Sequence, residues 1–203
     1  LAVSPANDLR PENFSLLFFL LLWSALESRR LKRPGPARGR RSAAAAVLFA
    51  LWANLHAGFL YGLVLLGLFA VVDALARRDW EPARLTAIAA AAALVNPYGI
   101  AVYRVPLEHW AELPVLERYI REWQEASVLS PWLWPFWAVL AVAFAAALAR
   151  YLAQRDVPPE HLAALCIFGL SGAAHVRTGV YFSSLAVPIT AAALCGFKAE
   201  TPE

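Results

Sequence analysis

Long apolar runs alternate with short polar segments along this chain, and the apolar runs are long enough to cross a membrane. They cover residues 13–28, 43–72, 84–103, 132–150, 160–175 and 179–197. A helix of about 20 apolar residues spans the hydrocarbon core of a bilayer. The pattern therefore predicts an all-α fold, a polytopic transmembrane bundle of about six to seven membrane helices in a single membrane domain over residues 1–203.

Residues 43–72 form one apolar run that is too long for a single crossing. At 1.5 Å per residue, about thirty residues extend well beyond a core of about 30 Å. The segments on both sides of this run are expected to be cytoplasmic, so the run is predicted to form a short helical hairpin that turns at "NLHAG" (54–58). Gly58 and Gly62 form a GxxxG motif, which allows close helix packing.

The polar segments differ in charge, and the difference predicts the side of the membrane that each one occupies. Residues 29–41 hold seven Lys or Arg and no acid, which predicts a cytoplasmic basic loop. Residues 104–131 lack this cationic excess and are placed outside, in the periplasm. Apolar residues recur there at helical spacing, at Leu113, Leu116, Ile120 and Trp123. The segment is therefore predicted to form an amphipathic helix at the outer interface.

Composition supports a membrane protein and excludes other classes. Of the 203 residues, 60% are hydrophobic and 16% charged, with a mean hydropathy of +0.52, whereas soluble domains carry about a quarter charged residues. The net charge of +3 lies in loops, so we expect no nucleic-acid partner. Cys166 and Cys195 are expected to be buried thiols, and the four histidines lack metal-ligand spacing. The chain has no methionine, which predicts a fragment of a longer protein whose N-terminal half is a partner.

Several uncharged polar residues are predicted to gather at the outer rim of the membrane, where they would share one site. Asn54 and His56 lie in the hairpin turn, and polar groups at membrane depth need partners or water. The motif "NPYG" (96–99) is either a helix terminator or a loop that presents Asn96 and Tyr98 to a lipid headgroup.

Three charged residues are placed at the same rim, and each has a second interpretation. Glu122 is either a catalytic carboxylate or part of a solvated face. Arg177, in "HVRTG" (175–179), is either a bidentate partner for a phosphate or a side chain that snorkels to the membrane edge. Arg10 either pairs with Glu12 or faces the shared site.

The order of five motifs resembles a large group of bacterial multi-spanning proteins. In this chain the motifs read "RPENFSLLFFLLLW", "LWANLHAGFLYG", "NPYG", "YIREWQ" and "HVRTGVYFSSLAVP", and they cover nearly the whole chain. The group is assigned to the C-type glycosyltransferases, which use lipid-linked sugars and are similar to protein mannosyltransferases. One departure is Ala57, which precedes Gly58 where the group often has two glycines.

The resemblance implies an inverting membrane glycosyltransferase that takes its sugar from a polyprenyl-phosphate donor at the periplasmic face of the bacterial inner membrane. Its partners would be membrane lipids and the polyprenyl-phosphate sugar, and it leaves room for a divalent metal. It implies Glu122 as a supporting carboxylate, Arg177 for the phosphate, and a main base upstream of Leu1. The motifs carry over Asn54, His56, Asn96, Tyr98, Glu122, Trp123, Gln124 and Arg177.

Two other functions remain open on the sequence. A transporter or lipid flippase needs polar residues through the depth of the membrane, and the Ala, Leu and Val interiors of these spans count against one. A non-enzymatic membrane scaffold would use its GxxxG and Ala-rich faces only for helix packing. In a scaffold the outer polar residues would tolerate substitution.

Overall fold

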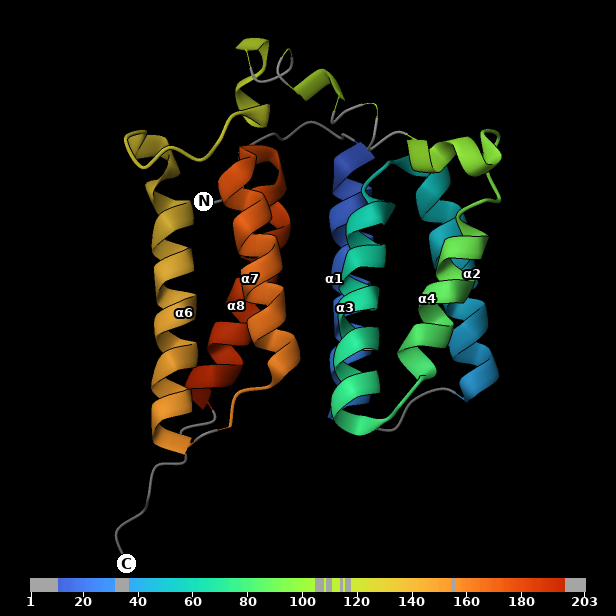
Figure 1. The fold of residues 1–203 in the computed structure, drawn as a ribbon, viewed down its shortest axis with the longest axis horizontal. Coiled ribbons are helices and arrows are strands. Elements are labelled where there is room, and N and C mark those ends of the chain that lie inside the picture. Colours follow the sequence, from blue (N-terminus) through green and yellow to red (C-terminus); the bar gives the residue numbers. More distant parts are fainter. Residues whose placement is uncertain are drawn as a thin grey trace, which may run out of the picture. The chain divides into compact units, whose positions relative to one another are not determined.

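The computed structural model describes residues 11–31, 37–104, 108, 111–113, 115, 118–154 and 156–195. Its elements are α1 (Pro11–Arg30), α2 (Arg38–Leu55), α3 (Phe59–Arg77), α4 (Glu81–Ala92), the 3₁₀ helices η1 (Gly99–Arg104), η2 (Arg121–Trp123) and η3 (Pro131–Leu133), α6 (Trp134–Gln154), α7 (Pro159–Ala174), η4 (Val176–Thr178) and α8 (Gly179–Cys195) (Figure 1). The described residues contain no strand, and the all-α prediction is confirmed.

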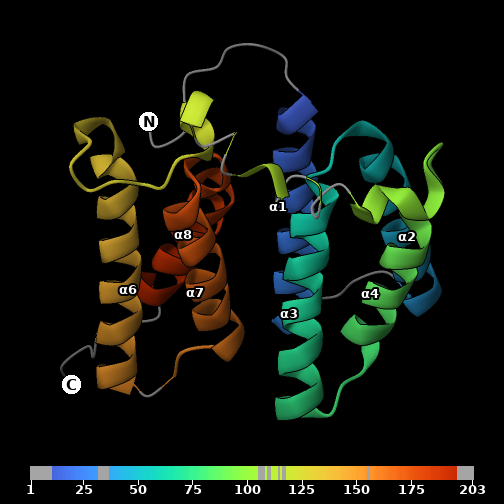
Figure 2. The same cartoon turned by 45° about the horizontal axis from the view of Figure 1, so that its top comes forward.

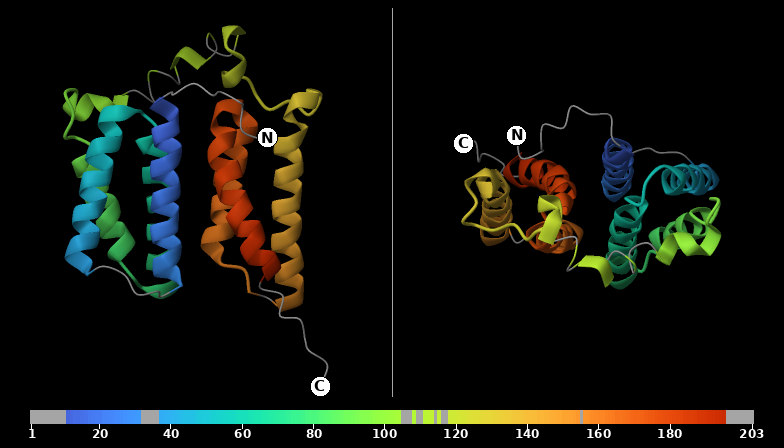
Figure 3. Two further views of the ribbon diagram at one scale, coloured as in Figure 1. Left: turned by 180° about the vertical axis from the view of Figure 1, so that it is seen from behind. Right: turned by 90° about the horizontal axis from the view of Figure 1, so that it is seen from above.

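The chain divides into two compact units, and each is described by itself. The N-terminal unit contains α1 to α4 and η1, and the C-terminal unit contains η2, η3, α6, α7, η4 and α8. In the N-terminal unit α4 packs on α2 and α3, while α1 packs on α3 and α2, as the end-on view shows (Figure 3). Aromatic side chains fill its core, among them Phe19, Phe49, Trp52, Phe59 and Phe69.

The predicted hairpin in residues 43–72 is present as α2, a short turn and α3. The α2 helix ends at Leu55, His56 has extended backbone, and α3 begins at Phe59, so the turn falls where "NLHAG" predicts it. A Cβ atom on Gly62 would meet the Trp52 ring at 2.5 and 2.8 Å. Glycine at this position therefore lets α3 approach α2 closely, as the GxxxG motif predicts.

The end of the N-terminal unit where α1 and α3 finish and α2 and α4 begin carries a network of ion pairs, which we call the charged end. Arg29 bonds Asp73 at 2.5 Å and also bonds Asp79, and Arg41 bonds Glu81 at 2.9 Å. The basic segment 29–41 thus begins and ends inside helices. Two of its arginines have carboxylate partners on α3, α4 and the turn between them.

These pairs also shift protonation equilibria. Burial alone would raise the pKa of Glu81, but hydrogen bonds and charge from Arg41 and Arg29 outweigh it and lower that pKa. Burial alone would lower the pKa of Arg29, but Asp73, Asp79 and Glu81 raise it. Because each shift favours the charged form, Glu81 and Arg29 stay ionised at neutral pH.

In the C-terminal unit, α8 packs against both α6 and α7 (Figure 2). Glycines make the approach close where α7 turns into α8. A Cβ on Gly172 would lie 2.9 Å from the Cα of Gly179 and 2.8 Å from the Phe136 ring. The Phe136 ring in turn packs edge-on against Phe182 at 5.4 Å between centroids, so one aromatic cluster holds α6 to α8.

Among the residues that the structure describes, three helical stretches are long and apolar enough to cross a membrane, Phe59–Arg77, Pro131–Gln154 and Val176–Cys195. The predicted count of six to seven is not reached, because α4 has 12 residues and α7 has 16, which reach only about 18 and 24 Å. The α1 and α2 helices carry charged residues near their ends, including Glu12, Glu27, Arg38 and Arg41. Exposed apolar side chains such as Leu170 and Val187 suit contact with lipid.

Two further expectations from the sequence differ from the structure. Ile120 has extended backbone (φ −122°, ψ 110°) and a 3₁₀ turn follows over Arg121–Trp123, so one helix does not carry Leu113 and Trp123 on a common face. Much of the preceding stretch lies outside the described residues. Cys166 and Cys195 are free but exposed rather than buried, because apolar helices present small residues to their outer faces as well as to the core.

Candidate functional site

At the other end of the N-terminal unit, which we call the turn end, His56 lies in a chain of hydrogen bonds that links α1, α2 and the turn. The Trp52 indole N–H donates to Ser15 Oγ at 2.8 Å, and Ser15 Oγ lies 2.8 Å from His56 Nδ1. The Gly58 N–H donates to the same Nδ1 at 3.0 Å. Ser15 and Trp52 are fully buried, so this chain belongs to the core of the unit.

The partners of His56 assign its tautomer. The Gly58 N–H can only donate, so His56 Nδ1 is an acceptor, and the Ser15 hydroxyl, which accepts from the Trp52 indole, donates its own hydrogen to Nδ1. A nitrogen that accepts from Ser15 and Gly58 carries no hydrogen, which places the proton of the neutral ring on Nε2. Burial lowers the pKa of His56. Protonation would also cost the ring the hydrogen bond from the Gly58 N–H, because a protonated Nδ1 cannot accept.

Asn54, Asn96 and Tyr98 lie at the same end and mainly shape the backbone. The Asn54 amide donates to the carbonyls of Ala50 at 2.7 Å and Val95 at 2.6 Å, which ties α2 to the segment after α4. The Asn96 amide donates to Ala93 O, while its oxygen accepts the Tyr98 N–H at 2.7 Å. This Asx turn agrees with the helix-terminator interpretation of "NPYG", and the Tyr98 side chain is exposed.

In the C-terminal unit, backbone hydrogen bonds join two segments about fifty residues apart in sequence. The Val176 N–H donates to Gln124 O at 3.0 Å, and the Ala126 N–H donates to Ala173 O at 2.8 Å. Inside the α7–α8 turn, the buried Thr178 hydroxyl bonds His175 O at 3.0 Å. Segment 122–126 is therefore fixed against this turn, and side chains from both are held in place.

Trp123 is the centre of the resulting cluster. The Arg177 guanidinium lies over its ring, 5.4 Å from the centroid, and the His175 ring meets it edge-on at 6.0 Å. Glu122 Oε2 lies 3.6 Å from Arg177 Nη1. We call these four residues, Glu122, Trp123, His175 and Arg177, the Trp123 cluster.

The hydrogen bond of His175 assigns its tautomer as well. His175 Nδ1 lies 3.0 Å from the carbonyl oxygen of Trp123. A carbonyl oxygen can only accept, so Nδ1 donates and carries the hydrogen. In the neutral ring Nε2 is then the nitrogen with a lone pair. Among the residues that the structure describes, none hydrogen-bonds to this Nε2.

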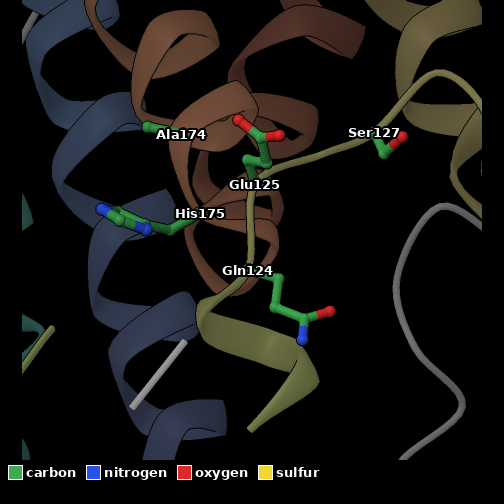
Figure 4. Close-up of a pocket in the computed structure, with 5 residues that line it drawn as sticks. All are labelled: Gln124, Glu125, Ser127, Ala174 and His175. Carbon is green, nitrogen blue, oxygen red and sulfur yellow. The ribbon is translucent and has the colours of Figure 1, made fainter. Parts of the chain in front are cut away.

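An open hollow of about 570 Å³ lies beside the cluster, lined by Gln124, Glu125, Ser127, Ala174 and His175. Figure 4 shows the Gln124 and Ser127 side chains on one side and the His175 ring directed away from them. The lining side chains therefore do not converge on one point. The hollow offers amide and hydroxyl groups suited to a polyhydroxylated ligand, while the titratable ring faces elsewhere.

The structure thus distributes the predicted site residues between two units. Asn54, His56, Asn96 and Tyr98 share the turn end, and Glu122, Trp123, Gln124 and Arg177 share the α7–α8 turn, whereas Arg10 lies outside the described residues. The sequence analysis missed Ser15, Trp52 and His175 as members of these groups. All three stand in quoted motifs: Ser15 in "RPENFSLLFFLLLW", Trp52 beside Asn54 and His56, and His175 beside Arg177.

Neither a metal site in the described residues nor a known relative indicates a function. In the part of the chain that the structure describes, no three His, Cys, Asp or Glu side chains gather as a metal ion would need. Compared with protein-family models, curated proteins and solved structures, the chain matches none of them. A functional assignment therefore has to come from the chemistry of the two groups.

Proposed function

We propose that this protein is a glycosyltransferase-like membrane protein that binds a polyprenyl-phosphate sugar at the α7–α8 turn and transfers the sugar there. The observation that carries the proposal is the position of Arg177. It is the second residue of the candidate span Val176–Cys195, so it lies where a lipid phosphate meets the membrane surface. A guanidinium binds phosphate oxygens in a bidentate fork.

The surroundings of Arg177 suit a replaceable anion. Its side chain is 32% exposed and that of Glu122 is 48% exposed, and such exposed pairs contribute only about 0–1 kcal/mol. A phosphate can therefore replace Glu122 at little cost. Stacking on Trp123 fixes the guanidinium plane before the ligand arrives, which reduces the entropy lost on binding.

By the charge rule used for membrane topology, the charged end of the N-terminal unit faces the cytoplasm. The motif resemblance implies that the donor site lies on the periplasmic side of a bacterial inner membrane.

One observation favours a second candidate, a non-enzymatic membrane scaffold. Asn54, His56 and Asn96 all bond groups of the protein itself. These internal bonds explain the positions of the three side chains without a ligand. The scaffold hypothesis therefore differs from the glycosyltransferase proposal only at Arg177, where it expects no lipid phosphate to bind.

Binding of undecaprenyl phosphate to the full chain in nanodiscs tests the proposal. We expect Arg177→Gln to weaken binding about tenfold or more, the loss of one strong charge-assisted contact. The matched control is Arg121→Gln, which removes the same charge from the exposed η2 turn and should change affinity less than about twofold. Uncharged undecaprenol should bind all three proteins equally.

Turnover is then measured with a panel of undecaprenyl-phosphate-linked hexoses and pentoses by following release of undecaprenyl phosphate. If the wild-type chain binds undecaprenyl phosphate no better than undecaprenol, or if Arg177→Gln binds it as well as wild type does, the glycosyltransferase proposal is wrong and the scaffold hypothesis takes its place.

A further inference from the structure

The Trp123 cluster contains a histidine whose ring is oriented as a proton acceptor. His175 is the residue at which α7 ends, with extended backbone at φ −141° and ψ 118°. Its N–H bonds Ser171 O at 2.9 Å, and its Nδ1 donates to Trp123 O at 3.0 Å. Two hydrogen bonds on opposite sides of the residue fix both the backbone and the ring.

This arrangement decides which nitrogen is reactive. Histidine acts as a general base only through a nitrogen that lacks hydrogen, and the tautomer is set by the hydrogen bond of the other nitrogen. With Nδ1 bonded to a carbonyl, the lone pair of the neutral ring is at Nε2. The ring is half-buried and packs edge-on against Trp123, the same indole that carries Arg177.

We propose that His175 is the general base that deprotonates the acceptor of the sugar, in place of the base upstream of Leu1 that the motif resemblance implies. This inference rests on the proposed function and adds a residue to which no role has been given so far. The acceptor O–H proton passes to His175 Nε2, and the acceptor oxygen forms a bond to the anomeric carbon. The bond from that carbon to the phosphate oxygen breaks, and its electron pair stays on the phosphate beside Arg177. The imidazolium then releases its proton to water.

The proposal gives each member of the cluster a separate task. Arg177 stabilises the leaving phosphate, His175 accepts the proton, and Trp123 holds both at a fixed separation through its ring and its carbonyl. Glu122 pairs with Arg177 until the phosphate of the donor replaces it.

The decisive variant is His175→Asn, because asparagine keeps one of the two functions of the ring. Its amide nitrogen occupies the place of Nδ1 and can donate to Trp123 O, whereas nothing replaces Nε2. With any donor of the panel that the wild-type chain turns over, we expect His175→Asn to lower kcat about 100-fold or more. Its affinity for undecaprenyl phosphate should stay within about twofold of wild type.

The matched control is His56→Asn, a substitution of the histidine in the α2–α3 turn. Asparagine keeps a hydrogen-bond acceptor at the position of Nδ1 and removes Nε2. The variant should leave kcat within about threefold of wild type.

Nitrogen NMR of the full chain labelled at histidine gives a readout independent of turnover. The resonances that disappear in His175→Asn should belong to an Nδ1–H tautomer, and those that disappear in His56→Asn to an Nε2–H tautomer. Wild-type turnover that survives in His175→Asn overturns the inference and leaves the proposed function standing. The absence of both donor binding and turnover in wild type removes the proposed function, and the base role is lost with it. An Nε2–H tautomer for His175 also overturns the inference.

Discussion

The histidines that end α2 and α7 occupy matching positions and have opposite chemistry. His56 and His175 both have extended backbone, and each N–H bonds the carbonyl four residues earlier. Each is followed within a few residues by a helix that could span a membrane. Nevertheless His56 Nδ1 accepts hydrogen bonds, whereas His175 Nδ1 donates one. The group that faces the ring, a hydroxyl or a carbonyl, makes the difference.

The consequence is a division of labour between the two turns. At His56 the lone pair at Nδ1 is used by Ser15 and Gly58, so the ring stabilises the hairpin and its reactivity is low. At His175 the donor side is used, and the lone pair remains available to a ligand. Two histidines that both have extended backbone after a helix can therefore be sorted into structural and reactive classes by their hydrogen-bond partners.

The largest expected effect concerns the N-terminal unit, where polar side chains bond to other groups of the protein. The Asp73 side chain is 3% exposed and pairs with both Arg29 and Arg77. Asp73→Asn leaves two arginines without this carboxylate, and we expect it to lower the free energy of unfolding by about 3 kcal/mol. SDS titration of the protein in mixed micelles measures the change.

The control is Asp79→Asn in the same network. Asp79 also pairs with Arg29, but its side chain is 45% exposed, and asparagine can still accept the Glu81 N–H that Asp79 Oδ1 accepts. We expect a loss below about 1 kcal/mol. Equal losses for the two variants would show that burial does not set the strength of this network.

The second prediction breaks the α7–α8 turn that positions His175. Gly172→Ala places a Cβ against the backbone of Gly179 and the Phe136 ring, so we expect a loss of about 2 kcal/mol from overpacking. Gly169→Ala is the matched control, since its nearest neighbours lie at 3.4 Å or more. It should be neutral or gain up to about 1 kcal/mol from helix propensity. The NMR signals of His175 should shift in Gly172→Ala and not in Gly169→Ala.

The third prediction breaks the other turn. Ser15→Ala removes the hydroxyl that links Trp52 to His56 and leaves a buried indole N–H unsatisfied, which costs about 1–2 kcal/mol. Ser24→Ala makes the same change on an exposed face of α1 and should cost less than about 0.5 kcal/mol. If the two variants unfold at the same SDS fraction, the Ser15 chain does not stabilise the turn.

How far the sequence could predict this fold depended on local signals. The hairpin at "NLHAG" was predictable, because a run of about thirty apolar residues exceeds one crossing and the turn carries polar residues and glycines. The end of α4 before "NPYG" was predictable as well, because this motif is a local turn signal that terminates a helix. The number of spans was not, because apolar composition is visible in α4 and α7 while their short lengths depend on where packing ends each helix.

The site was less predictable, because its contacts join distant segments. Nothing near Ser15 in the sequence indicates a bond to His56, 41 residues away. The tautomer of His175 depends on a carbonyl 52 residues away, and a backbone carbonyl has no sequence signature at all. Asn54 and His56 were predicted as ligands for a headgroup because they are polar at membrane depth, but internal partners satisfy the same requirement.

The smallest expected effect is a pH dependence that separates the two histidines. Burial lowers the pKa of His56 below 6.5 in the folded protein, so the unfolded chain binds the proton first as the pH falls. The stability that His56 contributes is therefore fully present above about pH 6.5 and decreases as the pH falls from there toward the lower pKa of the folded state. Unfolding in SDS at pH 8 and pH 5 should show this loss in wild type. His56→Asn, which keeps an acceptor and cannot titrate, should lose less stability over the same interval, whereas His175→Asn should retain the His56 contribution. A pH dependence that is unchanged in His56→Asn would mean that the turn does not hold the ring of His56 in its neutral form. The contrast between a structural His56 and a reactive His175 would then be wrong for His56.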